Sequence, residues 1–205
     1  MVPPSREFHD LWWKTSFSKF FKNRRKNLIE KIYGGFSNKK LKILEVGCGS
    51  GKDFISFYDQ NDQIEFTGVD LDDYGINQRN FKFLKLDAEN LPFKDKEFDL
   101  VISLGLLEHI VPIEKLSKII KEIDRVGKSY VMVVPAVNTI LEPHTKGIFW
   151  QLKDHNKKKK YKHAPLNYFS DDVWPNFEGF AGAKVKRFWH IPFLVCDLII
   201  SKVPS

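Results

Sequence analysis

Three glycines at alternate positions provide the first chemical lead in this chain. Gly47, Gly49 and Gly51 follow the apolar run 41–46. Because glycine has no Cβ, a turn built from it lets a ligand lie against bare backbone where a strand passes into a helix. A nicotinamide fingerprint would need glycine at position 52, where Lys52 stands, and no Gly-Lys-Ser/Thr follows at the spacing of a Walker loop. The pattern therefore predicts a ligand-binding turn of neither of those two types.

Two carboxylates stand at the ends of further expected strands. Asp70 closes the run 64–69, and Asp87 follows the run 81–86. A carboxylate at a strand tip can accept hydrogen bonds from both hydroxyls of a ribose. Since parallel strands present their carboxyl ends at one edge of a sheet, we expect both side chains close to the glycine turn.

The order of these motifs, with Leu91-Pro92-Phe93 and Leu107-Glu108-His109 behind them, resembles the class I S-adenosylmethionine-dependent methyltransferases. The resemblance covers about residues 41–135 and is closest to the "type 11" methyltransferase-domain subfamily. It implies S-adenosyl-L-methionine as cofactor, with Asp70 at the ribose and Asp87 at the adenine amino group. The cofactor-binding residues that it implies are Glu45, Gly47, Cys48, Gly49, Gly51, Asp70, Leu71, Asp87, Ala88, Ser103 and Leu104.

Catalytic residues are harder to read, because methyl transfer from a sulfonium depends mainly on position and orientation. If the acceptor is a hydroxyl, a histidine suits the removal of its proton near neutral pH. His109 after the fourth expected strand and His144 after the fifth are the candidates, with a supporting role as the alternative for His109. Cys48 and Cys196 have no CxxC partner, so the sequence indicates no metal site and no disulfide framework.

Apolar runs alternate with helical patterns, which predicts an α/β protein. We expect a three-layer Rossmann-like fold with a mostly parallel twisted sheet of about six to seven strands and helices on both faces. The run 182–189 is expected to be an edge strand, and for 192–203 a strand and an apolar helix both remain open. The central strands are expected at 41–46, 64–69, 81–86, 98–103 and 129–134, and the helices near 51–60 and over 112–125.

Segments on either side of the strand-rich region differ in character. Apolar residues at helical spacing over 5–33 predict an N-terminal helical appendage at 1–40, either a lid or a helix packed across the cofactor domain. Residues 41–205 are the predicted methyltransferase domain. The stretch of about 136–169 is long for a simple loop, which favours a substrate-side insertion.

Charge is uneven along a chain whose formal net charge is +7. Residues 1–40 hold ten basic and three acidic side chains, 153–163 hold six and one, and 41–152 hold thirteen and eighteen. The basic segments indicate an anionic partner or plain solvated surface, and the residues do not decide between these. The start of the chain has no apolar core of signal-peptide length, which favours a cytoplasmic location.

Three functions follow from these observations. The leading one is methyl transfer to an oxygen or nitrogen of a small-molecule or lipid-linked acceptor, with peripheral membrane contact through the N-terminus, Lys157–Lys160 and the apolar C-terminus. The second is an RNA methyltransferase that uses the same basic segments. The third is a non-catalytic binding subunit that keeps the methyltransferase fold.

Overall fold

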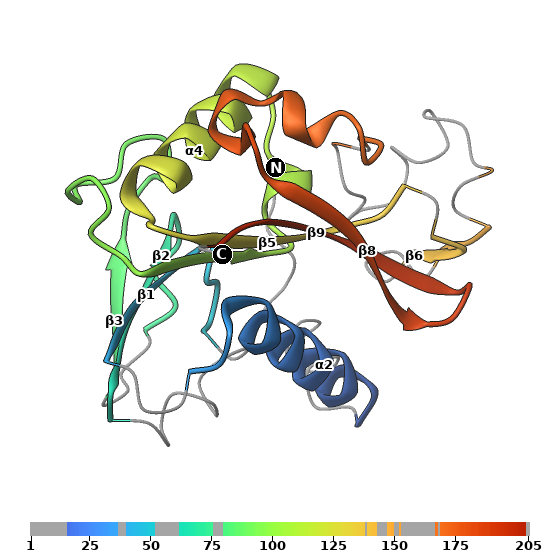
Figure 1. The fold of residues 1–205 in the computed structure, drawn as a ribbon, viewed down its shortest axis with the longest axis horizontal. Helices are drawn as coiled ribbons and strands as arrows, with labels where there is room; N and C mark the ends of the chain where they lie inside the picture. Colours follow the sequence, from blue (N-terminus) through green and yellow to red (C-terminus); the bar gives the residue numbers. More distant parts are fainter. Residues whose placement is uncertain are drawn as a thin grey trace. The chain divides into compact units, whose positions relative to one another are not determined.

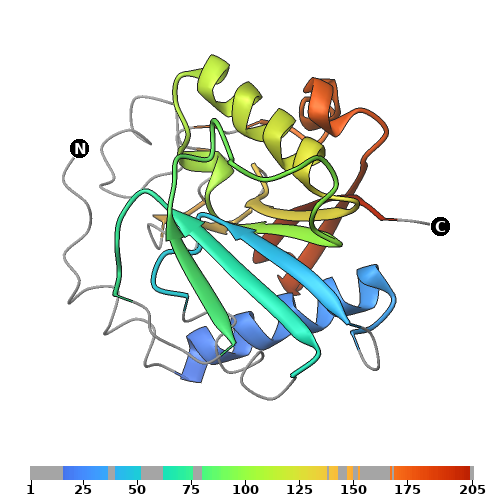
Figure 2. The same cartoon turned by 90° about the vertical axis from the view of Figure 1, so that its left-hand side faces the viewer.

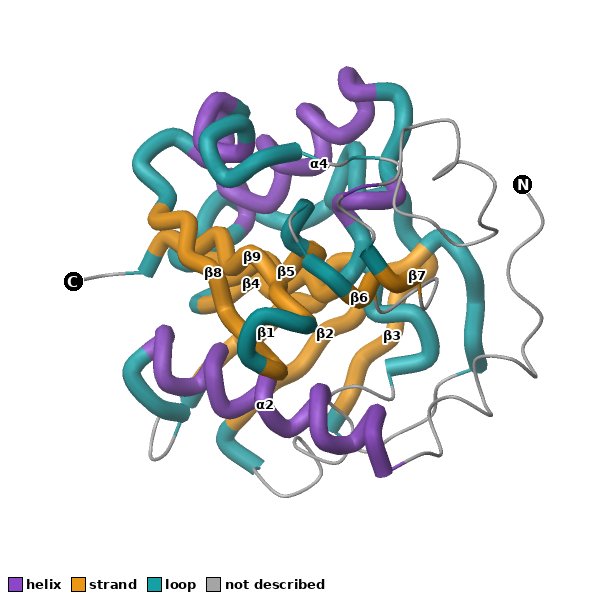
Figure 3. Tube along the Cα trace, turned by 90° about the vertical axis from the view of Figure 1, so that its right-hand side faces the viewer, coloured by secondary structure: helices purple, strands orange, loops and turns teal. Residues whose placement is uncertain are grey.

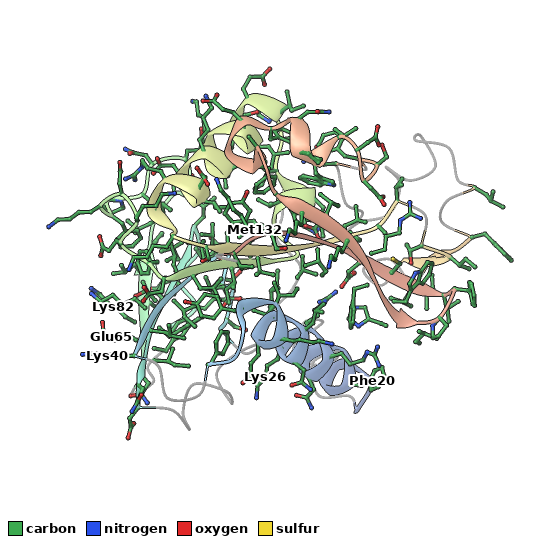
Figure 4. The ribbon with its side chains drawn as sticks, viewed as in Figure 1. Phe20, Lys26, Lys40, Glu65, Lys82 and Met132 are labelled. Carbon is green, nitrogen blue, oxygen red and sulfur yellow. The ribbon has the colours of Figure 1, made fainter. Side chains whose placement is uncertain are left out.

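A computed structural model describes residues 16–36, 40–51, 62–75, 80–137, 139–142, 147–149, 152, 167 and 169–203. The chain divides into two compact units, Met1–Phe36 and Ser37–Ser205. The first contains helix α2 (Ser16–Tyr33), from which Phe20 and Lys26 project (Figure 4). The helix ends at Gly34 and Gly35, which have φ values of +86° and +89° and cap the last carbonyls. The expected helical segment is present over this range, whereas its role as a lid stays a prediction.

The second unit is built on a seven-stranded sheet with strand order β3-β2-β1-β4-β5-β9-β8. The first five of these strands in the sheet order are parallel, while β9 and β8 run antiparallel to their neighbours. Figure 2 shows β1, β2 and β3 side by side. The strands are β1 (Leu41–Val46), β2 (Ile64–Asp70), β3 (Phe81–Lys85), β4 (Leu100–Leu104), β5 (Tyr130–Pro135), β8 (Lys184–Ile191) and β9 (Val195–Lys202).

Burial explains why the apolar runs are continuous rather than alternating. In β1 only Lys42 is exposed, and in β4 and β5 every residue but the last is buried. Strands at the centre of a parallel sheet have both faces covered, so both alternate sets of side chains must be apolar. The edge strand β8 has exposed Lys184 and Lys186, and such charges discourage pairing with another chain.

The C-terminal run, which the sequence left open between strand and helix, is β9. Seven of its eight residues are buried, and it lies between β5 and β8 (Figure 3). The expectation that the apolar C-terminus contacts a membrane is therefore wrong, because its side chains form part of the core. The backbone N–H of Leu141 donates to the carbonyl of Leu194 (N···O 2.9 Å), next to the turn between β8 and β9. Leu141 is the first residue of the short strand β6 (Leu141–Glu142), which pairs with β7 (Gly147–Ile148).

Helix α4 (Ile113–Val126) lies on one face of the sheet together with the 3-10 turns η3 (Trp174–Asn176) and η4 (Glu178–Phe180) (Figure 1). Its apolar stripe packs on the sheet around Met132, whose side chain is fully buried. The Tyr130 hydroxyl donates to the carbonyl of Gly179 (3.1 Å) and joins this layer to the sheet. The helix expected near 51–60 falls on residues outside the described ones. The buried stripe of α4 is Leu116, Ile119, Ile120, Ile123 and Val126.

Arg125 of α4 fastens the loop between β3 and β4. Its guanidinium donates to the carbonyls of Leu91 (2.8 Å) and Phe93 (2.7 Å) and to the carboxylates of Glu122 (2.7 Å) and Asp95 (2.9 Å). The hydrogen bond from Arg125 lowers the pKa of Glu122, whose carboxylate also accepts from the backbone N–H of Leu91. One planar cation thus holds four acceptors on two elements.

We expect Arg125→Lys to lower the free energy of unfolding by about 1–3 kcal/mol, because an ammonium cannot reproduce the planar fork and leaves carbonyls unsatisfied. Urea denaturation measures the difference. Lys121→Met is the matched control, since Lys121 pairs with Glu178 at 2.6 Å but both side chains are more than half exposed. Equal losses in the two variants would contradict the role given to Arg125.

Candidate functional site

The glycine turn is pinned to the end of β2. The backbone N–H groups of Gly47 and Cys48 both donate to the carbonyl of Val69 (2.9 and 3.1 Å). Gly47, Gly49 and Gly51 have φ values of +75°, +51° and +67°, which side chains rarely adopt. A Cβ on Gly49 would meet no protein atom within 4 Å, whereas one on Gly47 would lie 2.8 Å from the side chain of Leu106. The turn therefore leaves open space above Gly49.

Asp70, the last residue of β2, has its carboxylate oriented by two turns. Oδ2 accepts from the backbone N–H of Gly49 (2.8 Å), and Oδ1 accepts from that of Asp72 (3.2 Å). Each carboxylate oxygen can accept more than one hydrogen bond, so both retain capacity for a ligand hydroxyl. The predicted proximity of Asp70 to the glycine turn is confirmed.

A pocket opens at the carboxyl ends of the parallel strands. Five of the predicted cofactor residues line it, namely Gly47, Asp70, Leu71, Asp87 and Ala88. The other lining residues are Val69, Leu86, Leu106, Ile110, Lys115 and Ile119. Its wall is thus a ring of apolar side chains that holds two carboxylates and one ammonium, a composition typical of small-molecule sites.

Asp87 is tied to α4 by Lys115, a residue that the sequence analysis did not select. The Lys115 ammonium lies 3.4 Å from Asp87 Oδ2 and 2.8 Å from Glu89 Oε1. The hydrogen bond to Glu89 raises the pKa of Lys115, and the same bond lowers the pKa of Glu89. Asp87 Oδ1 also accepts from the backbone N–H of Glu89 (3.0 Å), so the carboxylate is held from two sides.

Other predicted cofactor residues lie behind the pocket wall. Ser103 is buried and its Oγ donates to the carbonyl of Val46 (2.8 Å), which joins the ends of β4 and β1. Glu45 is buried in β1. Burial raises the pKa of the Cys48 thiol, and the nearby carboxylates of Glu45 and Asp70 raise it further, so this thiol stays protonated and is no nucleophile. Gly49, Gly51 and Leu104 frame the same edge without lining the pocket.

Of the two candidate catalytic histidines, the structure describes only His109. His109 is half-buried at the end of the 3-10 turn η1 (Leu107–His109), and its flanking neighbours Leu106 and Ile110 line the pocket although it does not. The motif around His109 was the signal that could have identified those two neighbours. His144 lies outside the described residues.

The described ranges contain neither a metal-binding cluster nor a membrane-spanning helix. Within them, no group of three or more histidine, cysteine or acidic side chains is placed to hold a metal ion. In the same part of the chain, no helix has the length and apolar character needed to cross a bilayer.

The pocket has the features expected of a small-molecule site. Backbone approach is open at Gly49, the Asp70 carboxylate stands at a strand tip, and a second carboxylate, Asp87, stands at the next strand beside apolar side chains. Small-molecule sites commonly combine a few polar groups with apolar walls.

Sequence comparisons identify relatives. Residues 44–133 match the family described as "Methyltransferase domain". The protein MJ0638 of Methanocaldococcus jannaschii is 29% identical over 174 residues, which are 80% of this chain and 74% of that protein. The probable tRNA methyltransferase 9B of Mus musculus is 34% identical over 88 residues, 41% of this chain and 19% of that one. A phthiotriol/phenolphthiotriol dimycocerosates methyltransferase of Mycobacterium ulcerans is 34% identical over 92 residues, 42% and 33% of the two chains.

Solved structures agree on the fold. The PH0226 protein from Pyrococcus horikoshii has a TM-score of 0.69 with 19% identity, covering 97% of this chain and 99% of that one. The methyltransferase in a complex with the Haloferax volcanii Trm112 methyltransferase activator has a TM-score of 0.59 with 15% identity, covering 96% and 97%. The glycine turn, the strand-end carboxylates and the strand order agree with the family match over residues 44–133, and together they support a class I S-adenosylmethionine-dependent methyltransferase of the type 11 methyltransferase-domain family, with S-adenosyl-L-methionine as methyl donor.

Proposed function

We propose that the chain transfers the methyl group to an oxygen or nitrogen of a small-molecule or lipid-linked acceptor. The observation that carries the assignment of the site is the Asp70 carboxylate, held by the Gly49 N–H at the mouth of a pocket that also contains Asp87. S-Adenosylmethionine supplies an activated methyl group on its sulfonium, so the chain has to provide position more than chemical activation.

The proposed roles follow the positions of the residues. Asp70 accepts from the ribose hydroxyls, Asp87 accepts from the adenine amino group, and the backbone N–H of Ala88 faces the ring. Gly47 and Gly49 give backbone contact to the methionine part. The other residues act at the same edge of the sheet. Cys48 and Gly51 shape the turn, and Leu71 covers the ribose. Glu45 acts near the methionine ammonium through water or backbone, while Ser103 and Leu104 offer backbone groups.

The chemical step needs little from side chains. The acceptor atom attacks the methyl carbon in line, the new bond to carbon forms as the carbon–sulfur bond breaks, and the acceptor proton leaves to a base or to water. His109 is the proposed positioning or basic group, because its turn lies between Leu106 and Ile110, which both line the pocket. His144 is retained as a second candidate on its place in the sequence after β5.

Two observations favour a small or lipid-linked acceptor. One relative is named as a methyltransferase of phthiotriol and phenolphthiotriol dimycocerosates, which are lipids. The chain also combines basic segments with an excess of aromatic residues, 14% of its length, a composition suited to an apolar acceptor with an anionic group. A cytoplasmic protein that contacts a membrane peripherally through the basic segments is part of this proposal.

The alternative is an RNA methyltransferase. It is favoured by the likeness to a probable tRNA methyltransferase and by the structural neighbour seen with the Trm112 activator. In this alternative the basic residues of 1–40 and 153–163 neutralise phosphates, and a small activator subunit is the expected partner. The non-catalytic alternative is not kept, because the match to the methyltransferase-domain family over residues 44–133 supports methyltransferase activity.

Methyl transfer to sorted acceptors distinguishes these functions. The protein is incubated with S-adenosylmethionine labelled in the methyl group and with three fractions of a cell extract, an organic-soluble fraction, an aqueous small-molecule fraction and total RNA. Asp70→Ala provides the background. We expect label in the organic-soluble or small-molecule fraction. Label confined to nuclease-sensitive RNA would establish the alternative instead.

A further inference from the structure

Asn167 holds the turn η1 (Leu107–His109) and the next residue, Ile110, although it lies far away in sequence. Its backbone N–H donates to the carbonyl of Glu108 (2.8 Å). Its side-chain amide donates to the carbonyls of Leu107 (3.0 Å) and Ile110 (2.6 Å). One asparagine thus satisfies three carbonyls of a single short turn.

The turn is short. The 3-10 turn η1 is three residues long, its N-cap residue Leu106 makes no side-chain cap hydrogen bond, and its backbone bonds run from His109 to Leu106 (2.9 Å) and from Ile110 to Leu107 (3.3 Å). Turns of this length are poorly stabilised by their own hydrogen bonds. The three hydrogen bonds from Asn167 therefore add to those that define the turn.

The turn matters because the residues on either side of it form part of the wall of the proposed cofactor pocket. Leu106 precedes it and Ile110 follows it, and both line the pocket. Leu106 is also the side chain that a Cβ on Gly47 would meet at 2.8 Å, so it packs directly over the glycine turn. A shift of the turn would move apolar side chains in the wall of the pocket.

Asn167 lies next to a well-packed aromatic cluster. Phe169, two residues later, packs its ring edge-on against Trp174 with centroids 5.2 Å apart, and also lies against Phe177 at 5.8 Å. Trp174 is 1% exposed and belongs to the main core. A donor next to this aromatic cluster can hold a turn in place, because close-packed side chains resist displacement.

We propose that Asn167 is a positioning residue of the cofactor site, which acts through Leu106 and Ile110 and couples the chain after β5 to cofactor binding. The inference rests on the proposed use of this pocket for the adenosyl group. By linkage, if Asn167 holds the wall for the ligand, then the ligand must hold Asn167. S-Adenosylhomocysteine should therefore protect a backbone amide that does not line its pocket.

The test uses S-adenosylhomocysteine binding and hydrogen exchange on the full chain. In Asn167→Ala the dissociation constant measured by titration calorimetry should rise roughly 5- to 30-fold, the effect of one or two lost hydrogen bonds. In the wild type, saturating ligand should slow exchange of the Asn167 amide, which donates to Glu108. Asn167→His, whose ring N–H can replace the amide donor, should recover part of the affinity.

Asn176→Ala is the matched control. The side chain of Asn176 also donates to a backbone carbonyl, that of Asp172 (3.1 Å), but in a segment that does not touch the pocket. It should lower the melting temperature comparably and leave the dissociation constant unchanged. A dissociation constant of Asn167→Ala equal to that of the wild type would overturn the proposal. An exchange rate of the Asn167 amide in the wild type that is the same with and without ligand would also overturn it, and this second result does not depend on whether the variants fold. Absence of ligand binding by the wild type would instead refute the proposed function of the pocket.

Discussion

Asp70→Ala should weaken binding of S-adenosylhomocysteine by about 1.5–3 kcal/mol, or roughly 10- to 150-fold in the dissociation constant. The carboxylate is fixed by the Gly49 N–H at 2.8 Å and the Asp72 N–H at 3.2 Å, so its free lone pairs meet a ligand in a set direction. Its loss removes the acceptor proposed for the ribose hydroxyls and also frees the glycine turn. Titration calorimetry measures the effect.

Asp73→Ala is the control for Asp70. Asp73 is an exposed carboxylate three residues further on, and it likewise accepts a backbone hydrogen bond, from Gly75 at 2.8 Å, but it does not line the pocket. Its removal should leave the dissociation constant within twofold of the wild type. Comparable losses in the two variants would mean that general negative charge, rather than the Asp70 position, supports binding.

Gly47→Ala should strongly weaken cofactor binding. The backbone at Gly47 has φ of +75°, which costs a residue with a Cβ about 1–2 kcal/mol, and the added Cβ would lie 2.8–2.9 Å from three atoms of Leu106. Leu106 would have to move into the pocket that it lines. We expect a loss of more than tenfold in affinity, together with a modest fall in the free energy of unfolding.

Gly75→Ala separates backbone strain from the pocket effect. Gly75 has a similar φ of +61°, but a Cβ there would meet no atom within 4 Å. This variant should lose stability to a similar degree while it binds S-adenosylhomocysteine like the wild type. Unfolding curves and titration calorimetry are measured on both variants. Wild-type affinity in Gly47→Ala would contradict the prediction, because it would show that Leu106 can move aside without weakening ligand binding.

The sheet was predictable because its strands are nearly continuous apolar runs. Each of β1 to β5 lies within two residues of its expected start and end, since strands buried on both faces leave little choice of residue. The fourth strand begins at Leu100 rather than at residue 98, because Phe98 makes only an isolated bridge to Gly127. Local sequence was sufficient for this part of the fold.

The C-terminal strand could not be decided from sequence because a charged residue interrupts its apolar run. Asp197 is 1% exposed, and its Oδ2 lies 2.7 Å from Nε2 of His190 on the neighbouring strand β8. The partner that makes a buried carboxylate acceptable is thus supplied by tertiary pairing. Nothing in the run 192–203 alone shows that pairing.

The same limit applies to the cofactor site. Residues of the glycine turn and the strand tips were found because their positions follow from the order of strands. Lys115 reaches Asp87 only because the first turn of α4 lies at the carboxyl edge, and Asn167 reaches residue 108 only through the return of the chain after β5. Contacts between distant segments carry no signature in a single sequence.

The most direct test of the account is a binding comparison on the unmodified protein. Titration calorimetry measures the binding of S-adenosylmethionine, S-adenosylhomocysteine and oxidised nicotinamide adenine dinucleotide. It shows which of these ligands binds to the site formed by the glycine turn and Asp70. We expect both adenosyl ligands to bind with one site per chain and the dinucleotide not to bind. Binding of the dinucleotide with no heat from either adenosyl ligand would contradict the assignment of the pocket.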